Sequence, residues 1–302
     1  MKKIICIGEC ALDIVFENGV PVGSMPGGRI INAAAIMSRE NLPVKVVSEA
    51  SRDSVGDMIV SHLSAAGTDV SGIDRFTEGH TPVLIYTRDD KGLTSVTRYE
   101  DYPDECFDVV WPRIDEGDIV IYGGYYALDS RMRQRMMPLL THASERKAIL
   151  VYLPGFLPQQ QTRITRVMPA MFENLEIATL ILTRNQDLKI IFGTENAEDS
   201  FRNHINFYCR SLINVNATGQ RICYFGGTEV TEAEIPASLC RSLMWNAGAV
   251  AGVAGALLAH PEFTPEVLNA PDEQIRRTLL EAAVKTAAEA ARELTHSWQQ
   301  AH

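Results

Sequence analysis

The stretch "GGRIINAAAIMSRENLPVKVVSEASRDSVGDMIVSHLSAAG", residues 27–67, decides the fold class. Two glycines precede a segment whose apolar residues recur at the spacing of an α-helix. The apolar segment 43–50 is then short enough to be a buried strand. Residues 53–67 read as a second helix, and Gly67 ends it. With the apolar strand at 2–8, this stretch predicts a β-α-β-α order.

The same alternation continues along the chain. Further strands are predicted at 117–124, 147–155 and 178–185. The predicted helices are 130–145, 166–175, 197–212, 243–258 and the long alanine-rich tail 273–300. Strands that alternate with helices favour a mostly parallel sheet covered on both faces, which is an α/β fold.

Two predicted hairpins interrupt this rhythm. Residues 11–25 alternate around Asn18-Gly19, and residues 82–101 turn at Asp90-Lys91-Gly92. The hairpins are far apart in the chain, yet they can join into one small sheet beside the main one. Because no repeat, low-complexity tract or linker divides the chain, we expect a single domain over residues 1–302.

Composition narrows the function classes. The 302 residues carry a net charge of -10, so the basic footprint of a nucleic-acid partner is absent. The six cysteines form no zinc or redox spacing, which favours buried free thiols. The apolar run 243–259 is rich in Gly and Ala, so we interpret it as a core helix and expect no membrane partner. Acidic residues interrupt the apolar start of the chain, and we expect a cytoplasmic protein.

A set of motifs in fixed order carries a family resemblance. The set consists of Gly8, Asp13, Gly27-Gly28-Arg29-Ile30-Ile31-Asn32-Ala33-Ala34, and Asp53 with Gly56. In order and spacing it resembles the amino-terminal half of the PfkB or ribokinase-like carbohydrate kinases. The resemblance implies a ribokinase-like three-layer α/β/α sandwich with a small β lid, formed by about 11–25 and 82–101. It also implies ATP and Mg²⁺ as cofactors and a homodimer contact through the lid.

The resemblance implies a sugar-binding half. Asp13 would accept hydrogen bonds from two hydroxyls, and Asn32 would donate and accept at its helix start. Gly27 and Gly28 would let the backbone approach the ligand. The alternative role of Asp13 is a turn residue at a strand end, and that of Asn32 is a helix cap. Arg29 and the pair Arg98–Tyr99 can add basic or stacking contacts, but for these we favour a solvated face.

The phosphate-transfer half departs from the family pattern. The family's catalytic turn, D-T-x-G-A-G-D, falls on residues 243–249. Asn246-Ala247-Gly248 occupy the positions of the anion hole, and Ala249 occupies that of the general base. We therefore assign no catalytic residue. Neither Ala249 nor the alternative alignment to Val250 can accept a proton.

Two further kinase motifs are altered. The strand end that reads D-x-N in the family has Leu153 and Gly155 here. The N-x-x-E motif has Asn185 followed by Leu188, and Asp187 is one residue closer. One position rotates a helical side chain by about 100°. Asn185 and Asp187 are the candidates for contact with the metal, through water.

Three hypotheses follow. The first is an ATP-dependent kinase that transfers the γ-phosphate to a hydroxyl of a sugar or related molecule, with weakened activity. The second is a catalytically silent sugar- or nucleoside-binding relative, a sensor or partner subunit. The third is a structural relic without a ligand. Residues 250–258 also read as core helix, with Gly248, Gly252 and Gly255 along one face for close packing.

Overall fold

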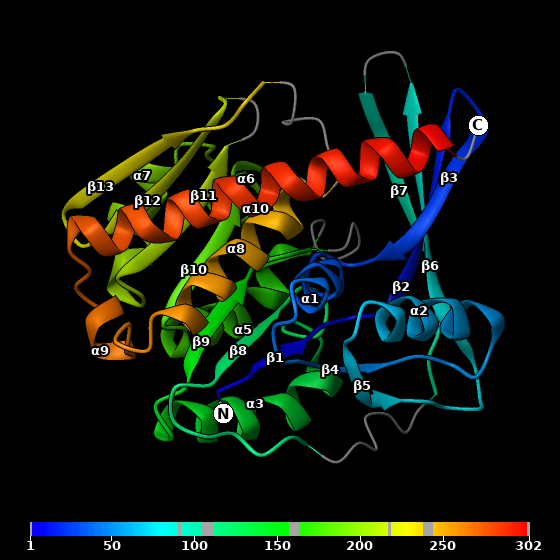
Figure 1. Cartoon of the computed structure of the whole chain (residues 1–302), viewed down its shortest axis with the longest axis horizontal. Helices are drawn as coiled ribbons and strands as arrows, with labels where there is room; N and C mark the ends of the chain where they lie inside the picture. The colour runs from blue at the N-terminus through cyan, green and yellow to red at the C-terminus, as the bar shows by residue number, and fades with distance from the viewer. Residues whose placement is uncertain are drawn as a thin grey trace.

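The computed structural model describes the backbone of most of the chain. The described ranges are 2–89, 92–103, 111–156, 163–216, 219–237 and 244–300. Nine strands form one sheet in the order β13-β12-β11-β10-β9-β8-β1-β4-β5 (Figure 1). They are β1 (Ile4–Ile7), β4 (Val44–Glu49), β5 (Asp69–Asp74), β8 (Ile119–Gly123), β9 (Ile149–Leu153), β10 (Leu180–Arg184), β11 (Ser211–Asn216), β12 (Arg221–Gly226) and β13 (Glu229–Glu234).

Helices cover both faces of this sheet, as the alternating pattern predicted. In the sheet order given above, each strand from β11 through β5 runs parallel to its neighbours in that part of the sheet. At the other edge, β12 and β13 are added antiparallel. One core joins the sheet to α1 (Arg29–Arg39), α2 (Ser54–Ala65), α8 (Trp245–Ala259), α9 (Pro265–Leu268) and α10 (Glu273–Gln300). The other core joins it to α3 (Ser130–Glu145), α5 (Ile164–Ile177), α6 (Asn185–Phe192) and α7 (Ala197–Asn203). The predicted α/β class is confirmed.

The two hairpins pair with each other in a separate four-stranded sheet. Its order is β3-β2-β6-β7, with β2 and β6 parallel at its centre. The strands are β2 (Ala11–Glu17), β3 (Val20–Gly27), β6 (His80–Asp89) and β7 (Gly92–Asp101). Asn18 and Gly19 have positive φ, as the first turn requires. Of the second turn, Asp90 and Lys91 lie outside the described residues.

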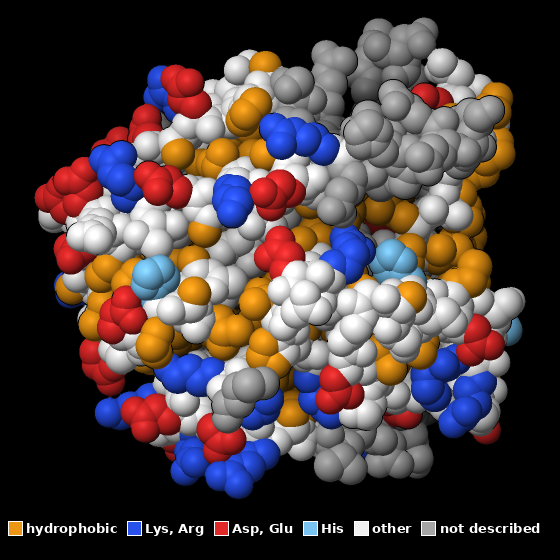
Figure 2. Space-filling view, viewed as in Figure 1, with side chains coloured by type: hydrophobic (Ala, Val, Ile, Leu, Met, Phe, Trp, Pro, Cys, Tyr) orange, Lys and Arg blue, Asp and Glu red, His pale blue; other side chains and the backbone are white. Residues whose placement is uncertain are grey.

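Hydrophobic side chains gather at the edge of the molecule where the small sheet lies (Figure 2). Val20 and Tyr99, both on this sheet, are 61% and 60% exposed. The homodimer contact through this sheet stays a prediction.

The prediction of one helix over 197–212 is wrong for the second half of this range. The α-helix ends at Asn203, a 3₁₀ turn covers Ile205–Phe207, and β11 begins at Ser211. Residues of β11 pair with both β10 and β12. These long-range strand contacts override the local helical pattern.

Four of the six cysteines, Cys6, Cys10, Cys209 and Cys223, are free and buried, as predicted. Cys106 and Cys240 lie outside the described residues. Within the described ranges, no helix combines the length and hydropathy that a membrane crossing requires.

Glycines of α8 allow α10 to approach it closely. A Cβ at Gly248 would lie 2.5 Å from the Ala287 Cα, and one at Gly252 would lie 2.2 Å from the Ala282 carbonyl oxygen. Gly255, predicted to lie along the same face, is not packed against α10. Its nearest neighbour is Leu42 Cδ1, at an ordinary 3.5 Å.

Alanine substitutions should therefore have opposite effects at two glycines of the same helix. In Gly252→Ala the added methyl group would push the backbones of α8 and α10 apart, so this change should destabilise the protein by about 2 kcal/mol. Gly255→Ala has room for its methyl group and gains helix propensity, so it should stabilise by up to about 1 kcal/mol. Urea unfolding of both variants tests this, and equal effects would contradict the packing described.

Candidate functional site

A cleft opens where the central strands end. It has a volume of about 200 Å³ and lies at the carboxyl ends of β8, β9 and β10, beside the start of α1. This edge is where open α/β sheets bind ligands. Tyr86 of the small sheet also lines the cleft. Leu153 and Gly155, the positions where the sequence departs from D-x-N, are part of its wall.

A buried carboxylate organises one side of this cleft. Asp187, fully buried at the start of α6, accepts hydrogen bonds from Arg184 Nε at 3.0 Å, Arg184 Nη2 at 2.5 Å and the Arg184 backbone N–H at 2.9 Å. Arg29 Nη1 lies 3.5 Å from the same carboxylate, and Arg29 Nη2 donates to the Pro154 carbonyl oxygen. Burial alone would raise the pKa of Asp187, but the two guanidinium groups outweigh it and hold the pKa below its usual value.

A second buried ion pair lies at the cleft. Arg98 of β7 donates to the carboxylate of Glu9, which lines the cleft, and Tyr102 donates to the same oxygen at 3.1 Å. Arg98 also contacts the ring of Tyr125, 4.8 Å from its centroid. Burial raises the pKa of Glu9 above its usual value, while Arg98 opposes this shift. The pair ties the small sheet to the loop after β1.

Asp13 lies next to the cleft on β2. Its carboxylate fills the space that a side chain at Gly27 would need, 2.2 Å from a Cβ there. Tyr86 hydrogen-bonds to it, and Asp13 Oδ1 is buried without a hydrogen-bond partner. Burial, together with the negative charge of Glu9, raises the pKa of Asp13 to about 7. This oxygen faces Gly27 and keeps an unused acceptor.

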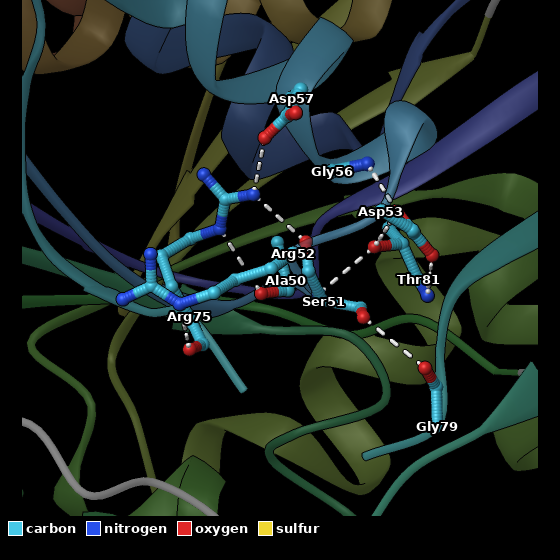
Figure 3. Close-up of polar contacts among 9 residues, drawn as sticks. All are labelled: Ala50, Ser51, Arg52, Asp53, Gly56, Asp57, Arg75, Gly79 and Thr81. Carbon is cyan, nitrogen blue, oxygen red and sulfur yellow. Dashed lines mark hydrogen bonds and ion pairs between the residues drawn. The ribbon is translucent and has the colours of Figure 1, made fainter. Parts of the chain in front are cut away.

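Asp53 and Gly56 of the D-x-x-G motif anchor the small sheet rather than line the cleft (Figure 3). Asp53 caps α2 by accepting from the Gly56 N–H at 2.7 Å. It also accepts from the Thr81 N–H and hydroxyl, both at 2.8 Å, at the start of β6. A Cβ at Gly56 would lie 2.1 Å from the Ser51 carbonyl oxygen, so the tight turn requires glycine.

The predicted catalytic turn is largely absorbed into α8. The Gly248 N–H donates to the Met244 carbonyl within the helix, at 2.8 Å. Asn246 and Ala247 lie in the first turn, where backbone N–H groups lack intrahelical acceptors and suit a phosphate. Ala249 is fully buried in the core. Residues 238–243, which precede the helix, lie outside the described residues.

The predicted metal residues do not fit Mg²⁺. Both carboxylate oxygens of Asp187 are occupied by guanidinium groups, whereas Mg²⁺ requires carboxylates or phosphates as its ligands. Asn185 Nδ2 donates to the Glu195 carbonyl at 2.6 Å, which leaves its Oδ1 as a single amide oxygen. Across the described residues, no group of three or more His, Cys, Asp or Glu side chains is arranged to hold a metal ion.

The sequence identified some of the residues at the cleft and missed others. Gly28 lines it, while Asn32 is half-buried one turn further along α1. The expectation of a solvated face is wrong for Arg29 and Arg98, whose side chains are 14% and 1% exposed, and correct for Tyr99. The missed residues are Glu9, Tyr86 and Arg184. Glu9 had one available signal, its position between Gly8 and Asp13 of the family pattern.

The comparisons with known proteins agree with this architecture. The model of the pfkB family carbohydrate kinases matches residues 1–206, about two thirds of the chain. The chain belongs to the pfkB family. None of the curated proteins matches this family member by sequence at a significant level.

Solved structures of sugar and nucleoside kinases share the fold at low identity. Aminoimidazole riboside kinase from Salmonella enterica, complexed with aminoimidazole riboside and an ATP analog, is 14% identical with a TM-score of 0.75. The alignment covers 96% of this pfkB-family chain and 93% of that chain. Fructokinase from Xylella fastidiosa with bound ATP is 18% identical, with coverage of 96% and 93% and a TM-score of 0.72. Fructokinase from Vibrio cholerae O395 with fructose, ADP and calcium ion is 14% identical, with coverage of 96% and 92% and a TM-score of 0.73. The ribokinase-like fold is thus confirmed.

The raised pKa of Asp13 in this pfkB-family protein predicts a pH dependence of its stability. Between pH 4 and 7 the folded protein holds a proton that the unfolded chain releases, so stability should fall as pH rises through this window. An asparagine at this position cannot ionise. Between pH 5 and 8 the free energy of unfolding should therefore fall less for Asp13→Asn than for the unsubstituted protein, by on the order of 2 kcal/mol. Urea unfolding of both proteins at the two pH values tests this. Parallel pH profiles would contradict it.

Proposed function

We propose that this chain binds a small sugar or nucleoside in the cleft, and that it transfers phosphate from ATP to this ligand slowly or not at all. The observation that carries the proposal is the occupied carboxylate of Asp187. The acid nearest to the family's phosphate-organising Glu is bound by Arg184 and Arg29. It therefore has no free oxygen for a metal ion.

Ligand binding is supported by the groups at and beside the cleft. The unpaired oxygen of Asp13 and the carboxylate of Glu9 can accept hydrogen bonds from adjacent hydroxyls. Gly28, with φ of 97°, places backbone in the cleft wall, and a Cβ there would lie 2.8 Å from the Glu9 carbonyl oxygen. The solved structures of similar fold, among them complexes with aminoimidazole riboside and with fructose, are consistent with this ligand class.

Slow transfer is supported at the catalytic turn. The sequence from Pro236 to Ala259 contains no Asp or Glu, so this segment supplies no general base. Loss of a general base typically costs 10²–10⁴ in rate. Asn246 and Ala247 lie in the first turn of α8, and a helix start favours the binding of nucleotide phosphates. ATP would supply the transferable phosphoryl group if it binds there.

Thermal shift and ADP release together test the proposal. A panel of sugars and nucleosides should raise the melting temperature, while ADP release with ATP and Mg²⁺ should stay at trace level. Asp13→Asn, purified in the same way, controls for contaminating kinases and should lose the shift caused by the ligand. Ligand-dependent turnover of about 1 s⁻¹ or more, in the usual range of enzymes, would overturn the proposal of slow transfer. Absence of any stabilising ligand would overturn ligand binding.

Restoring an acid at the catalytic turn should not restore activity. Ala249 is surrounded by apolar side chains, so Ala249→Asp buries a charge without a partner. We expect a loss of about 3 kcal/mol in stability, on the scale of unpaired buried charges, and no gain in ADP release. A gain in turnover would show that the missing base is the sole defect.

A further inference from the structure

The charges on one wall of the cleft do not cancel. Arg29 and Arg184 both line the cleft, and they share the single carboxylate of Asp187. Arg184 contacts both carboxylate oxygens, through Nε at 3.0 Å and Nη2 at 2.5 Å. The three side chains together therefore carry one excess positive charge. An anion in the cleft would balance it.

Arg29 also has a donor without an acceptor. Its Nη1 is buried and makes no hydrogen bond, because Asp187 lies 3.5 Å away and Arg184 occupies the favourable positions. Burial lowers the pKa of Arg29 to about 10. A buried donor without a well-placed acceptor is unfavourable, and more so when it is charged. An anionic oxygen placed beside Nη1 would remove this cost.

The start of α1 lies at the same wall. Its cap residue, Gly28, provides no side-chain hydrogen bond, and the first turn contains no acidic residue. Gly28, Arg29 and Ile30 all line the cleft. The first N–H groups of an α-helix lack intrahelical acceptors and carry partial positive charge. The helix start thus adds to the attraction that the two arginines exert.

Acids also lie at and beside the cleft. Glu9 accepts from Tyr102 and shares Arg98 with Glu100, so this second cluster carries one excess negative charge and favours hydroxyl donors. Asp13 has an oxygen without a partner, and burial raises its pKa to about 7, so it is partly protonated at neutral pH. The cleft therefore offers guanidinium groups and a helix start to an anion, and carboxylate oxygens to hydroxyl groups.

We propose that the ligand of this cleft is a small hydroxylated molecule carrying a phosphate or carboxylate group, which binds Arg29, Arg184 and the start of α1 without a metal ion. The inference rests on the proposed function, because it assigns the charge of the ligand that the cleft takes. Guanidinium groups suit this role, since their N–H donors match two oxygens of either anion.

Titration calorimetry in the presence of EDTA tests the proposal. The probes are D-fructose 6-phosphate, D-gluconate, D-fructose, inorganic phosphate and ADP. We expect the sugar phosphate or the sugar acid to bind at least tenfold more tightly than fructose and than inorganic phosphate. The comparison between fructose 6-phosphate and gluconate shows which anion the site prefers. Affinity should fall as salt rises, because the contact is electrostatic.

Variants locate the anion. Arg29→Gln should weaken binding of the preferred anionic ligand by tenfold or more and leave binding of fructose unchanged. Arg29→Lys keeps the charge beside Asp187, so it serves where Arg29→Gln does not fold, and it should weaken binding by a smaller factor. The matched control is Arg202→Gln, which removes one positive charge from the exposed surface of α7. It should leave the affinity unchanged.

The outcomes separate this inference from the proposed function. Fructose binding as tightly as both anionic sugars would overturn the inference and leave ligand binding intact. Binding of ADP alone would assign the arginines to a nucleotide and overturn it as well. Equal losses in Arg29→Gln and Arg202→Gln would show a general charge effect, which also overturns it. An anionic sugar that binds and is phosphorylated rapidly would support the inference and overturn slow transfer. No binding by any probe would overturn the inference, and the panel of sugars and nucleosides would then decide ligand binding by itself.

Discussion

The carboxylate of Asp187 is the constraint on which the cleft depends. It is fully buried, and a charge in the protein interior is tolerated only when partners surround it. Arg184, at the end of β10, supplies three of its hydrogen bonds. Arg29, at the start of α1, approaches the same group and also donates to Pro154 after β9. One carboxylate thus connects α1, α6 and the ends of two strands.

The same arrangement distinguishes this carboxylate from a typical Mg²⁺ ligand. The residue type that Mg²⁺ prefers is present, but its oxygens are taken by cations within the protein. Two guanidinium groups against one carboxylate leave a positive wall where a metal ion would otherwise supply positive charge. The proposed slow transfer and the proposed anion site therefore rest on one physical arrangement. The burial of Ala249 in α8 agrees with the first of these proposals.

The small sheet is held against the main sheet by buried polar contacts as well as by chain connections. Arg98 donates to Glu9, and Asp53 accepts from Thr81 (Figure 3). Each contact joins a strand of the small sheet to a loop that follows a strand of the main sheet. Because these two contacts hold the small sheet in place, Tyr86 of β6 lines the cleft and hydrogen-bonds to Asp13. The composition of the cleft therefore depends on both sheets.

The sequence by itself determined the α/β class, the two hairpins and most helices, because these follow from local periodicity and from turn residues such as Asn18-Gly19. It also located Gly28 at the cleft through the order of the family motifs. Only the tertiary structure decided which charges are buried and what they bind. Arg29 and Arg98 read as solvated residues, and their burial depends on Asp187 and Glu9, which are distant in the chain. A charged side chain is buried only where folding brings it a partner, and no local pattern records that partner.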